Sequence, residues 1–302
     1  MRLVMFLVGS EPHIGALNGT GIVDLSARGA AAGVDMPATL LEVIDGGDMY
    51  LPRLRTILDG LGGEDPAADY AFGEVRILPP LDPPRGNVLA IGRNYEEHAK
   101  ESALARNEEV TRPTVFTKAQ TSITGPFDDI PVDERVTTQV DWEVELGVVI
   151  GRTGRDIPTE QALDHVFGYT VINDLSARDV QFGWGGQYFK GKSLDGFCPV
   201  GPSVVTADEV EDPQQLAVRL RVNGELKQEA STADMIFPVA ELIAQLSVGM
   251  TLPAGTLIAT GTPSGVGFAR KPPEFLQAGD VVEAEVVGIG TLRNRLTGPA
   301  TV

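Results

Sequence analysis

Residues 139–151, QVDWEVELGVVIG, decide both the fold and the chemistry of this chain. Apolar residues alternate there with Asp141, Glu143 and Glu145, before Gly147 leads into an apolar run. This alternation predicts a β-strand with the three acids on one face, because successive side chains of a strand point to opposite faces. Neighbouring acids repel one another unless a cation lies among them. The stretch therefore predicts a divalent-metal site built from Glu143 and Glu145. Taken alone, it is equally compatible with a solvated acidic face.

The composition is that of an ordinary globular protein with a strongly acidic balance. The chain has 302 residues, of which 42% are hydrophobic and 22% charged, enough for a large core and one or two domains. Its net charge of −18 argues against nucleic acid and anionic membranes as partners, since both require a basic surface. An anionic substrate would therefore need locally placed cations or a metal.

The cellular compartment is predicted from the cysteine content and from the lack of long apolar runs. Cys198 is the only cysteine, so no disulfide can form within the chain, which fits a reducing compartment. The apolar run at 3–8 is too short for a signal-peptide core, and no run approaches the roughly 20 apolar residues of a membrane helix. We therefore expect a cytoplasmic protein.

Residues 1–78 predict a small N-terminal accessory domain of mixed α/β type. Strands are expected at 3–8 and 21–25, with Asn18-Gly19 as a hairpin turn, and leucine and isoleucine spacing predicts helices at 39–44 and 50–61. A linker is expected at 79–87, because four prolines within eight residues cannot continue a helix or a central strand.

Residues 88–302 predict a larger domain made of many short strands. Apolar runs separated by Gly and Pro predict strands at 88–91, 115–118, 144–150, 168–173, 201–205, 217–222, 256–260, 281–286 and 290–296. Asn223-Gly224 predicts a hairpin turn into a further strand at 225–229. Residues 238–246 predict an amphipathic helix. Many strands with few helices favour a β-rich mixed α+β fold, a sandwich or roll, over a doubly wound sheet.

A third carboxylate comes from Asp174, directly after the apolar residues 171–173. Two Glu and one Asp would form an all-oxygen site, which suits Mg²⁺, Mn²⁺ or Ca²⁺ better than Zn²⁺. Three protein carboxylates also leave positions open for substrate and water. The alternative, that Asp174 caps the turn that follows it, stays open at this point.

Two polar segments could supply proton transfer and charge stabilisation. His98 and Glu101 lie three residues apart in NYEEHAKES, so on a helix the carboxylate could orient the imidazole and raise its basicity. Such a pair is more often an incidental surface pair. Lys190 and Lys192 lie among aromatic residues and glycines, where a partly buried lysine could stabilise an oxyanion; a surface turn is the alternative.

The segment 259–268, ATGTPSGVGF, is a glycine-rich loop. It lacks the Gly-Lys-Ser/Thr ending of a P-loop, so a nucleotide site is not expected. Its backbone N–H groups and Thr262 could instead contact an anion. Cys198 is interpreted as a buried packing residue, because no base stands beside it in the sequence.

Together, these segments resemble the fumarylacetoacetate hydrolase (FAH) family. The carriers are GRNYEEHAKE, DWEVELGVVIG, GYTVINDLSARDVQ, KGKSLDGFCPVGP and ATGTPSGVG, in the family's order, over about two-thirds of the chain. The resemblance implies an FAH-type β-sandwich roll with the small N-terminal module of bacterial members, and a homodimer. It also implies Mg²⁺ or Mn²⁺ held by Glu143, Glu145 and Asp174.

The resemblance also implies roles for other residues. His98 and Glu101 would be a water-activating dyad, on a segment that orders as a lid over bound substrate, and Lys192 would be the active-site lysine. We expect residues 103–111 of that lid to set specificity. The candidate substrate contacts are Arg178, Gln181 and Thr262, which match family positions, together with Arg93, Tyr95 and Lys118.

One departure from the family pattern bears on the substrate. The long-chain members that cleave fumarylacetoacetate carry an additional metal carboxylate ahead of the histidine, and residues 91–97, IGRNYEE, offer no obvious counterpart. The resemblance therefore implies a smaller 2-oxo acid as the substrate.

We predict a divalent-metal-dependent hydrolase of C–C bonds in a small 1,3-dicarbonyl or 2-oxo acid, of the acylpyruvate or 2,4-dioxo acid type. The metal would stabilise an enolate, His98 oriented by Glu101 would activate water, and Lys192 would hold the oxyanion. Decarboxylation of an oxaloacetate-like acid and isomerisation of a 2-hydroxydiene-dioate are alternatives that use the same residues. A non-catalytic metal-binding protein is the alternative from another class.

Overall fold

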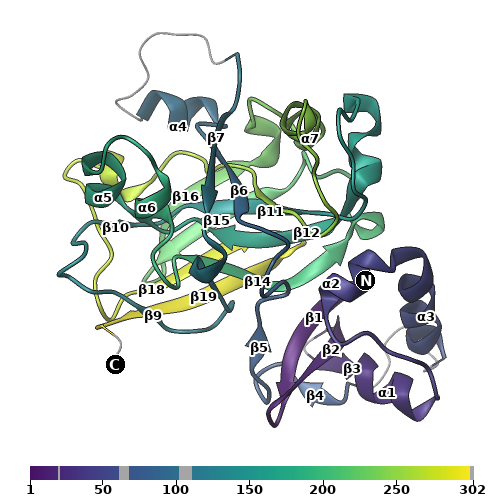
Figure 1. Ribbon diagram of the computed structural model, residues 1–302. Helices are drawn as coiled ribbons and strands as arrows, with labels where there is room; N and C mark the ends of the chain where they lie inside the picture. Colours follow the sequence, from purple (N-terminus) through teal and green to yellow (C-terminus); the bar gives the residue numbers. More distant parts are fainter. Residues whose placement is uncertain (20, 61–67, 102–110, 300–302) are drawn as a thin grey trace.

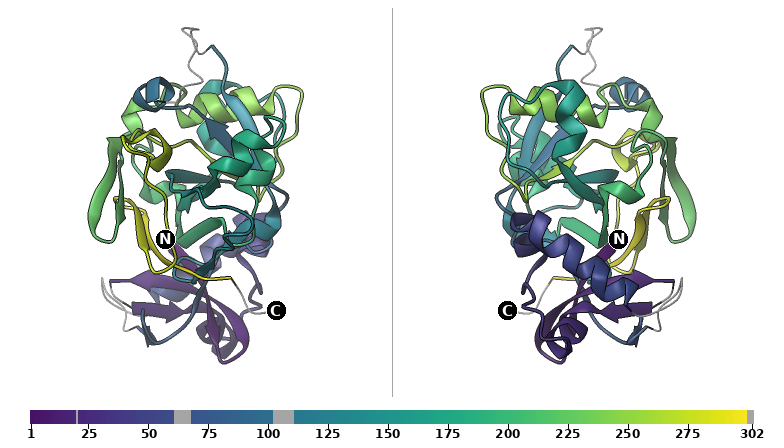
Figure 2. Two further views of the ribbon diagram at one scale, coloured as in Figure 1. Left: turned by 90° about the vertical axis from the view of Figure 1, so that its left-hand side faces the viewer. Right: turned by 90° about the vertical axis from the view of Figure 1, so that its right-hand side faces the viewer.

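The computed structural model describes residues 1–19, 21–60, 68–101 and 111–299. Figures 1 and 2 show a strand-rich body with a smaller N-terminal module, coloured purple, at one side. The strands of the N-terminal module are β1 (Arg2–Val8), β2 (Glu11–Asn18), β3 (Gly21–Asp24), β4 (Tyr70–Ala71) and β5 (Ile77–Leu78). Its helices are α1 (Leu25–Ala31), α2 (Leu40–Asp45) and α3 (Gly47–Asp59).

The remainder of the chain supplies most of the strands. They are β6 (Val88–Gly92), β7 (Thr114–Lys118), β8 (Ile123–Thr124), β9 (Ile130–Pro131), β10 (Val140–Asp141), β11 (Val144–Ile150), β12 (Val166–Asn173), β13 (Ser176–Ala177), β14 (Cys198–Thr206), β15 (Ala217–Val222), β16 (Glu225–Ser231), β17 (Leu257–Ala259), β18 (Val281–Val286) and β19 (Gly290–Thr297). The helices are α4 (Glu96–Glu101), α5 (Arg178–Gly183), α6 (Phe189–Lys192) and α7 (Val239–Ser247).

Two sheets organise these strands. A 12-stranded sheet follows the order β4-β3-β2-β1-β14-β12-β11-β17-β6-β7, with β5 paired to β1 and β8 paired to β14. A 5-stranded sheet has the order β16-β15-β18-β19-β9, and β10 pairs with β13 in a small ladder. The predicted β-rich mixed α+β fold is confirmed. No helix in the described part of the chain is long and apolar enough to cross a membrane.

The main hydrophobic core lies where β11 and β12 contact the 5-stranded sheet. Apolar side chains from both sheets fill it, among them Val144, Leu146, Val148, Val171, Val218, Leu220, Ala284 and Leu292. Helix α7 adds the side chains of the predicted amphipathic helix, Val239, Leu242, Ile243 and Leu246, all of them buried. A central strand packed on both faces should be apolar throughout, which makes the acids at the start of β11 exceptional.

The strand expected over 139–151 is interrupted in the structure. β10 ends at Asp141, Trp142 and Glu143 lie between strands, and β11 begins at Val144. β11 is antiparallel to both of its neighbours, β12 and β17, and all seven of its residues are buried. Asp141, Glu143 and Glu145 are 0%, 5% and 1% exposed. The interpretation as a solvated acidic face is therefore wrong.

The N-terminal module continues the large sheet. β1 pairs with β14 in antiparallel register, with Leu3 opposite Val204. A second core cluster joins residues of the module, such as Leu3 and Leu54, to Val149 of β11 and Val204 of β14. The division of the chain at 79–87 stays a prediction, because the module and the larger unit share this core.

Candidate metal centre and active site

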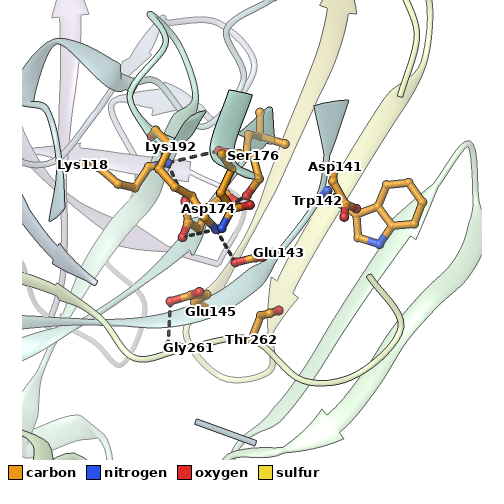
Figure 3. A network of polar contacts seen from close by, with 12 residues as sticks. Lys118, Asp141, Trp142, Glu143, Glu145, Asp174, Ser176, Lys192, Gly261 and Thr262 are labelled. Atoms are coloured by element: carbon orange, nitrogen blue, oxygen red, sulfur yellow. Dashed lines mark hydrogen bonds and ion pairs between the residues drawn. The ribbon is translucent and has the colours of Figure 1, made fainter. Parts of the chain in front are cut away.

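The three predicted ligands meet where the start of β11 lies beside the end of β12. Val144 pairs with Asn173, so Glu143 and Glu145 flank one end of this ladder and Asp174 follows the other strand. The Asp174 N–H donates to the Glu143 carbonyl oxygen at 2.8 Å, and the Glu143 N–H donates to Asn173 Oδ1 at 3.0 Å. Glu143, Glu145 and Asp174 each offer an oxygen within 4.8 Å of the others (Figure 3). The sequence prediction of an acidic cluster is thus matched in space.

The electrostatics of this triad favour a bound cation. Burial, together with the negative charges of Asp174 and Glu143, raises the pKa of Glu145 well above its usual value. Burial would also raise the pKa of Glu143, but the charges of Lys192, Arg178 and His98 lower it to about 2. Buried carboxylates are costly unless they are paired. An all-oxygen donor set of this kind fits Mg²⁺ or Mn²⁺.

Two buried lysines contact the triad. Lys192 Nζ, at the end of α6, donates to Glu143 Oε2 and Asp174 Oδ2, both at 2.8 Å. Lys118 Nζ donates to Asp174 Oδ1 at 2.5 Å and to the carbonyl oxygens of Leu175 and Lys192. Both side chains are almost fully buried, at 0% for Lys118 and 2% for Lys192. Lys118 therefore holds Asp174 and the chain around it in place.

Arg178 joins the triad to Asp141. Its Nη2 donates to Glu143 Oε1 at 2.6 Å, its Nε to Asp141 Oδ2 at 2.8 Å, and its Nη1 to Gln181 Oε1 at 2.9 Å. Asp141 also accepts from the N–H groups of Gly267 and Phe268 at 2.6 and 3.0 Å. Figure 3 shows Asp141 lying apart from the three ligands. The third acid of the stretch is thus an anchor for Arg178 rather than a member of the triad.

The glycine-rich loop after β17 contacts the triad through its backbone. The Gly261 N–H donates to Glu145 Oε2 at 2.7 Å. Gly261 has a φ of +99°, and a Cβ there would lie 2.8 Å from Asn94 Cβ. Only glycine fits this close approach without strain. Thr262 Oγ1 donates to the Val144 carbonyl oxygen at 2.9 Å and accepts from Gln228 Nε2 at 2.8 Å. The anion that this loop binds in the structure is therefore the carboxylate of Glu145.

A pocket of about 440 Å³ of empty space, including its open mouth, adjoins the triad at Glu143. Its lining includes seven predicted site residues, namely Arg93, His98, Glu143, Arg178, Gln181, Lys192 and Thr262. Aromatic side chains of Phe116, Phe182, Tyr188 and Phe268 complete much of the wall. Tyr95 and Lys118 are buried and are not among the lining residues, and their role as substrate contacts stays a prediction.

The His98–Glu101 pair is only half described. His98 lies in α4, is 7% exposed and lines the pocket. The side chain of Glu101 and residues 102–110 lie outside the described part of the chain, so the dyad and the lid at 103–111 stay predictions. Tyr95 is buried, and burial together with the negative charges of Glu145 and Asp234 raises its pKa.

Sequence reasoning missed two buried polar residues, Asn94 and Gln228, whose hydrogen bonds hold the backbone around the site in place. Asn94 is fully buried, and its side chain bonds to the main chain at Phe237 and Thr260. Gln228 is 1% exposed and bridges the Val144 N–H and Thr262. Asn94 stands inside the segment GRNYEEHAKE, so the surrounding motif could have indicated its role. No motif around Gln228 in the sequence indicates that it lies at the site.

Comparison with known proteins places this geometry in a family. Residues 87–297 match the family described as fumarylacetoacetate (FAA) hydrolase, C-terminal. The oxaloacetate tautomerase YisK of Bacillus subtilis is 44% identical over 264 residues, which cover 86% of this chain and 87% of YisK.

Two solved structures are similar over nearly the whole chain. The fumarylacetoacetate hydrolase EaFAH of Exiguobacterium antarcticum has a TM-score of 0.82 at 42% identity and covers 99% of each chain. Maleylpyruvate hydrolase from Sphingobium sp. SYK-6, in complex with manganese(II) and pyruvate, has a TM-score of 0.79 at 28% identity, covering 99% of this chain and 100% of that one. A homodimer stays a prediction for the present chain.

Proposed function

The chain belongs to the fumarylacetoacetate hydrolase family, and from that premise we propose that it is a metal-dependent tautomerase of a small 2-oxo dicarboxylic acid of the oxaloacetate type. Its similarity to an oxaloacetate tautomerase over 86% of the chain supports this reaction. The manganese and pyruvate bound by maleylpyruvate hydrolase support a small oxo acid beside a divalent metal.

The observation that carries the proposal is the buried triad, which adjoins the pocket at Glu143. Glu143, Glu145 and Asp174 would hold Mg²⁺ or Mn²⁺, because they are carboxylates whose oxygens converge within 4.8 Å of one another. When bound, such a cation polarises a ketone and stabilises the negative charge of the enol form.

The other residues would bind the substrate and move its proton. In tautomerisation the carbon beside the ketone loses one proton and the ketone oxygen gains one, so no water is consumed. His98 lines the pocket and is the imidazole placed to carry this proton. Lys192 and Arg178 fix Glu143 from two sides, which keeps the carboxylate charged and oriented. The aromatic wall would exclude water from the enol.

Hydrolysis of a C–C bond in an acylpyruvate or 2,4-dioxo acid is the second candidate. The structural similarity to maleylpyruvate hydrolase favours it. This reaction needs one more element than tautomerisation, a water activated by His98, which Glu101 would orient. Decarboxylation of oxaloacetate would use the same divalent cation, which would stabilise the enolate that remains when carbon dioxide leaves.

One comparative assay tests the proposal. Purified protein with Mg²⁺ or Mn²⁺ is mixed with enol oxaloacetate, and the loss of enol absorbance is compared with the metal-only background. Pyruvate release and acetylpyruvate cleavage are measured in parallel. We expect enol loss to be the fastest reaction and to disappear in His98→Asn and Glu145→Gln. Arg135→Gln is the matched control, because Arg135 is 85% exposed and pairs with Asp133. Enol loss at the background rate would refute tautomerisation, and rapid acetylpyruvate cleavage would favour the second candidate.

A further inference from the structure

Most of the positive charges at the pocket are already committed to protein carboxylates. Arg178 uses Nε, Nη1 and Nη2 for Asp141, Gln181 and Glu143. Lys192 donates to Glu143 and Asp174. A substrate carboxylate at either group would compete with these buried protein carboxylates for the positive charge, and weakening a buried pair is costly.

Arg93 differs from these residues in having an uncommitted donor. It follows β6, is half-buried and lines the pocket. Its Nη2 donates to Thr114 Oγ1 at 3.0 Å, while its Nε is buried without a hydrogen-bond partner among the described residues. A buried donor without an acceptor costs free energy and needs an explanation. A ligand oxygen in the pocket would supply the missing acceptor.

The backbone of Arg93 is also held in an unfavourable conformation. Its φ is +57°, in the left-handed region that residues other than glycine rarely adopt. The next residue, Asn94, is firmly held: its side chain donates to the Thr260 and Phe237 carbonyl oxygens at 2.8 and 3.1 Å and accepts from the Phe237 N–H at 2.8 Å. Strain that the surroundings maintain in this way is concentrated at functional sites.

The charge of the site provides an independent argument. The buried ionic cluster contains four carboxylates and three cations, namely Asp141, Glu143, Glu145, Asp174, Lys118, Arg178 and Lys192. With all of them ionised and a divalent cation bound, the formal charge is one positive unit. Arg93 raises it to two, which a dianion neutralises and a monoanion does not. Buried charge is stable only when it is balanced.

We infer that Arg93 binds the carboxylate of the substrate that lies farther from the ketone, and that this contact selects dicarboxylic over monocarboxylic oxo acids. The inference rests on the proposed function, because it requires a small oxo acid in this pocket. The donors are Nε and the end of the guanidinium near Thr114, which together could receive the two carboxylate oxygens side by side.

Calorimetric binding to Mg²⁺-loaded protein separates this contact from catalysis. Lactate and malate are suitable probes, since both are 2-hydroxy acids and malate differs only by the distal carboxylate. We expect malate to bind about 10- to 100-fold more tightly than lactate, as for one charge-assisted contact. In Arg93→Asn this preference should fall below about 3-fold while lactate binding is unchanged, because asparagine tolerates the left-handed backbone. Arg93→Lys should retain an intermediate preference.

A charge-matched control and three outcomes complete the test. Arg155→Gln removes one positive charge beyond the far end of β11, where Arg155 is 59% exposed, and it should leave the preference unchanged. Equal binding of malate and lactate to the wild-type protein would overturn the role of Arg93 but not the oxo-acid site. A preference that survives in Arg93→Asn would do the same. Failure of both probes to bind would overturn the proposed function and this inference with it.

Discussion

Replacing Arg178 with leucine should destabilise the protein strongly, although the residue lies at the start of a short helix. The guanidinium is 3% exposed and pairs with two buried carboxylates, Asp141 at 2.8 Å and Glu143 at 2.6 Å. Removing one partner of a buried ion pair costs about 3–5 kcal/mol, because the remaining charge is left uncompensated. Its position 4.4 Å from the Phe268 ring centroid adds a cation–π contact that would also be lost.

The remaining partners of the two carboxylates place the expected loss toward the lower end of that range. Asp141 would keep its bonds from the N–H groups of Trp142, Gly267 and Phe268, and Glu143 would keep Lys192. We therefore expect a loss of about 3 kcal/mol in the free energy of unfolding. Arg178→Lys should lose less stability, because an ammonium retains the positive charge. Some loss should remain, because an ammonium cannot reach three acceptors in the directions of the guanidinium.

Urea unfolding followed by circular dichroism, with a chelator present, measures this loss. Arg135→Gln, which breaks an exposed ion pair, should change the unfolding free energy by less than about 0.5 kcal/mol. Saturating Mg²⁺ should restore part of the stability of Arg178→Leu, because a cation at Glu143 would replace the lost charge. A loss below about 1 kcal/mol in Arg178→Leu would refute the argument that this arginine compensates two buried carboxylates.

Three further predictions concern the triad. Because the pKa of Glu145 is raised by burial and by the neighbouring carboxylates, the metal-free protein should hold a proton there that Mg²⁺ displaces. Calorimetry of Mg²⁺ binding in buffers of different ionisation enthalpy should show proton release that diminishes as the pH rises above that pKa. Equal binding heats in all of these buffers would contradict this prediction. Glu145→Gln should weaken Mg²⁺ binding by more than the roughly 10- to 100-fold lost with outer-shell partners, as measured by titration. Gly261→Ala should lower stability by about 1–3 kcal/mol, because its φ is +99° and a Cβ would lie 3.0 Å from the Ile91 carbonyl oxygen; an unchanged unfolding midpoint would show that the loop relaxes freely.

The fold and the clustering of the three carboxylates could be predicted because each leaves a local signal. Alternating and continuous apolar runs gave β11, β15, β18 and helix α7 with boundaries within a residue of the observed ones, since period and burial are coupled. Glu143 immediately precedes β11, Glu145 lies within it, and Asp174 directly follows β12, the strand that pairs with β11. Sequence spacing and sheet geometry therefore agree at this point.

The parts that could not be predicted depend on contacts between distant residues. Asp141 shares the alternation of the other two acids, yet the chain breaks its strand after Asp141, and the acid turns to Arg178, 37 residues away. Gln228 meets Thr262 only through the tertiary fold. Local periodicity contains no information about such partners, because hydrogen bonding in a buried site is decided by the whole packing.

The strand pairing between β1 and β14 affects how the larger unit, which carries the acidic triad, can be studied in isolation. A fragment beginning after the proline-rich segment would retain the triad but would lose the module's half of the core shared with Val149 and Val204. It would also bare the edge of β14 that Leu3 covers. Unpaired strand edges recruit strands from other chains. Excision of the amino-terminal module should thus produce an aggregating fragment, because the module covers the edge of the sheet that carries the three carboxylates.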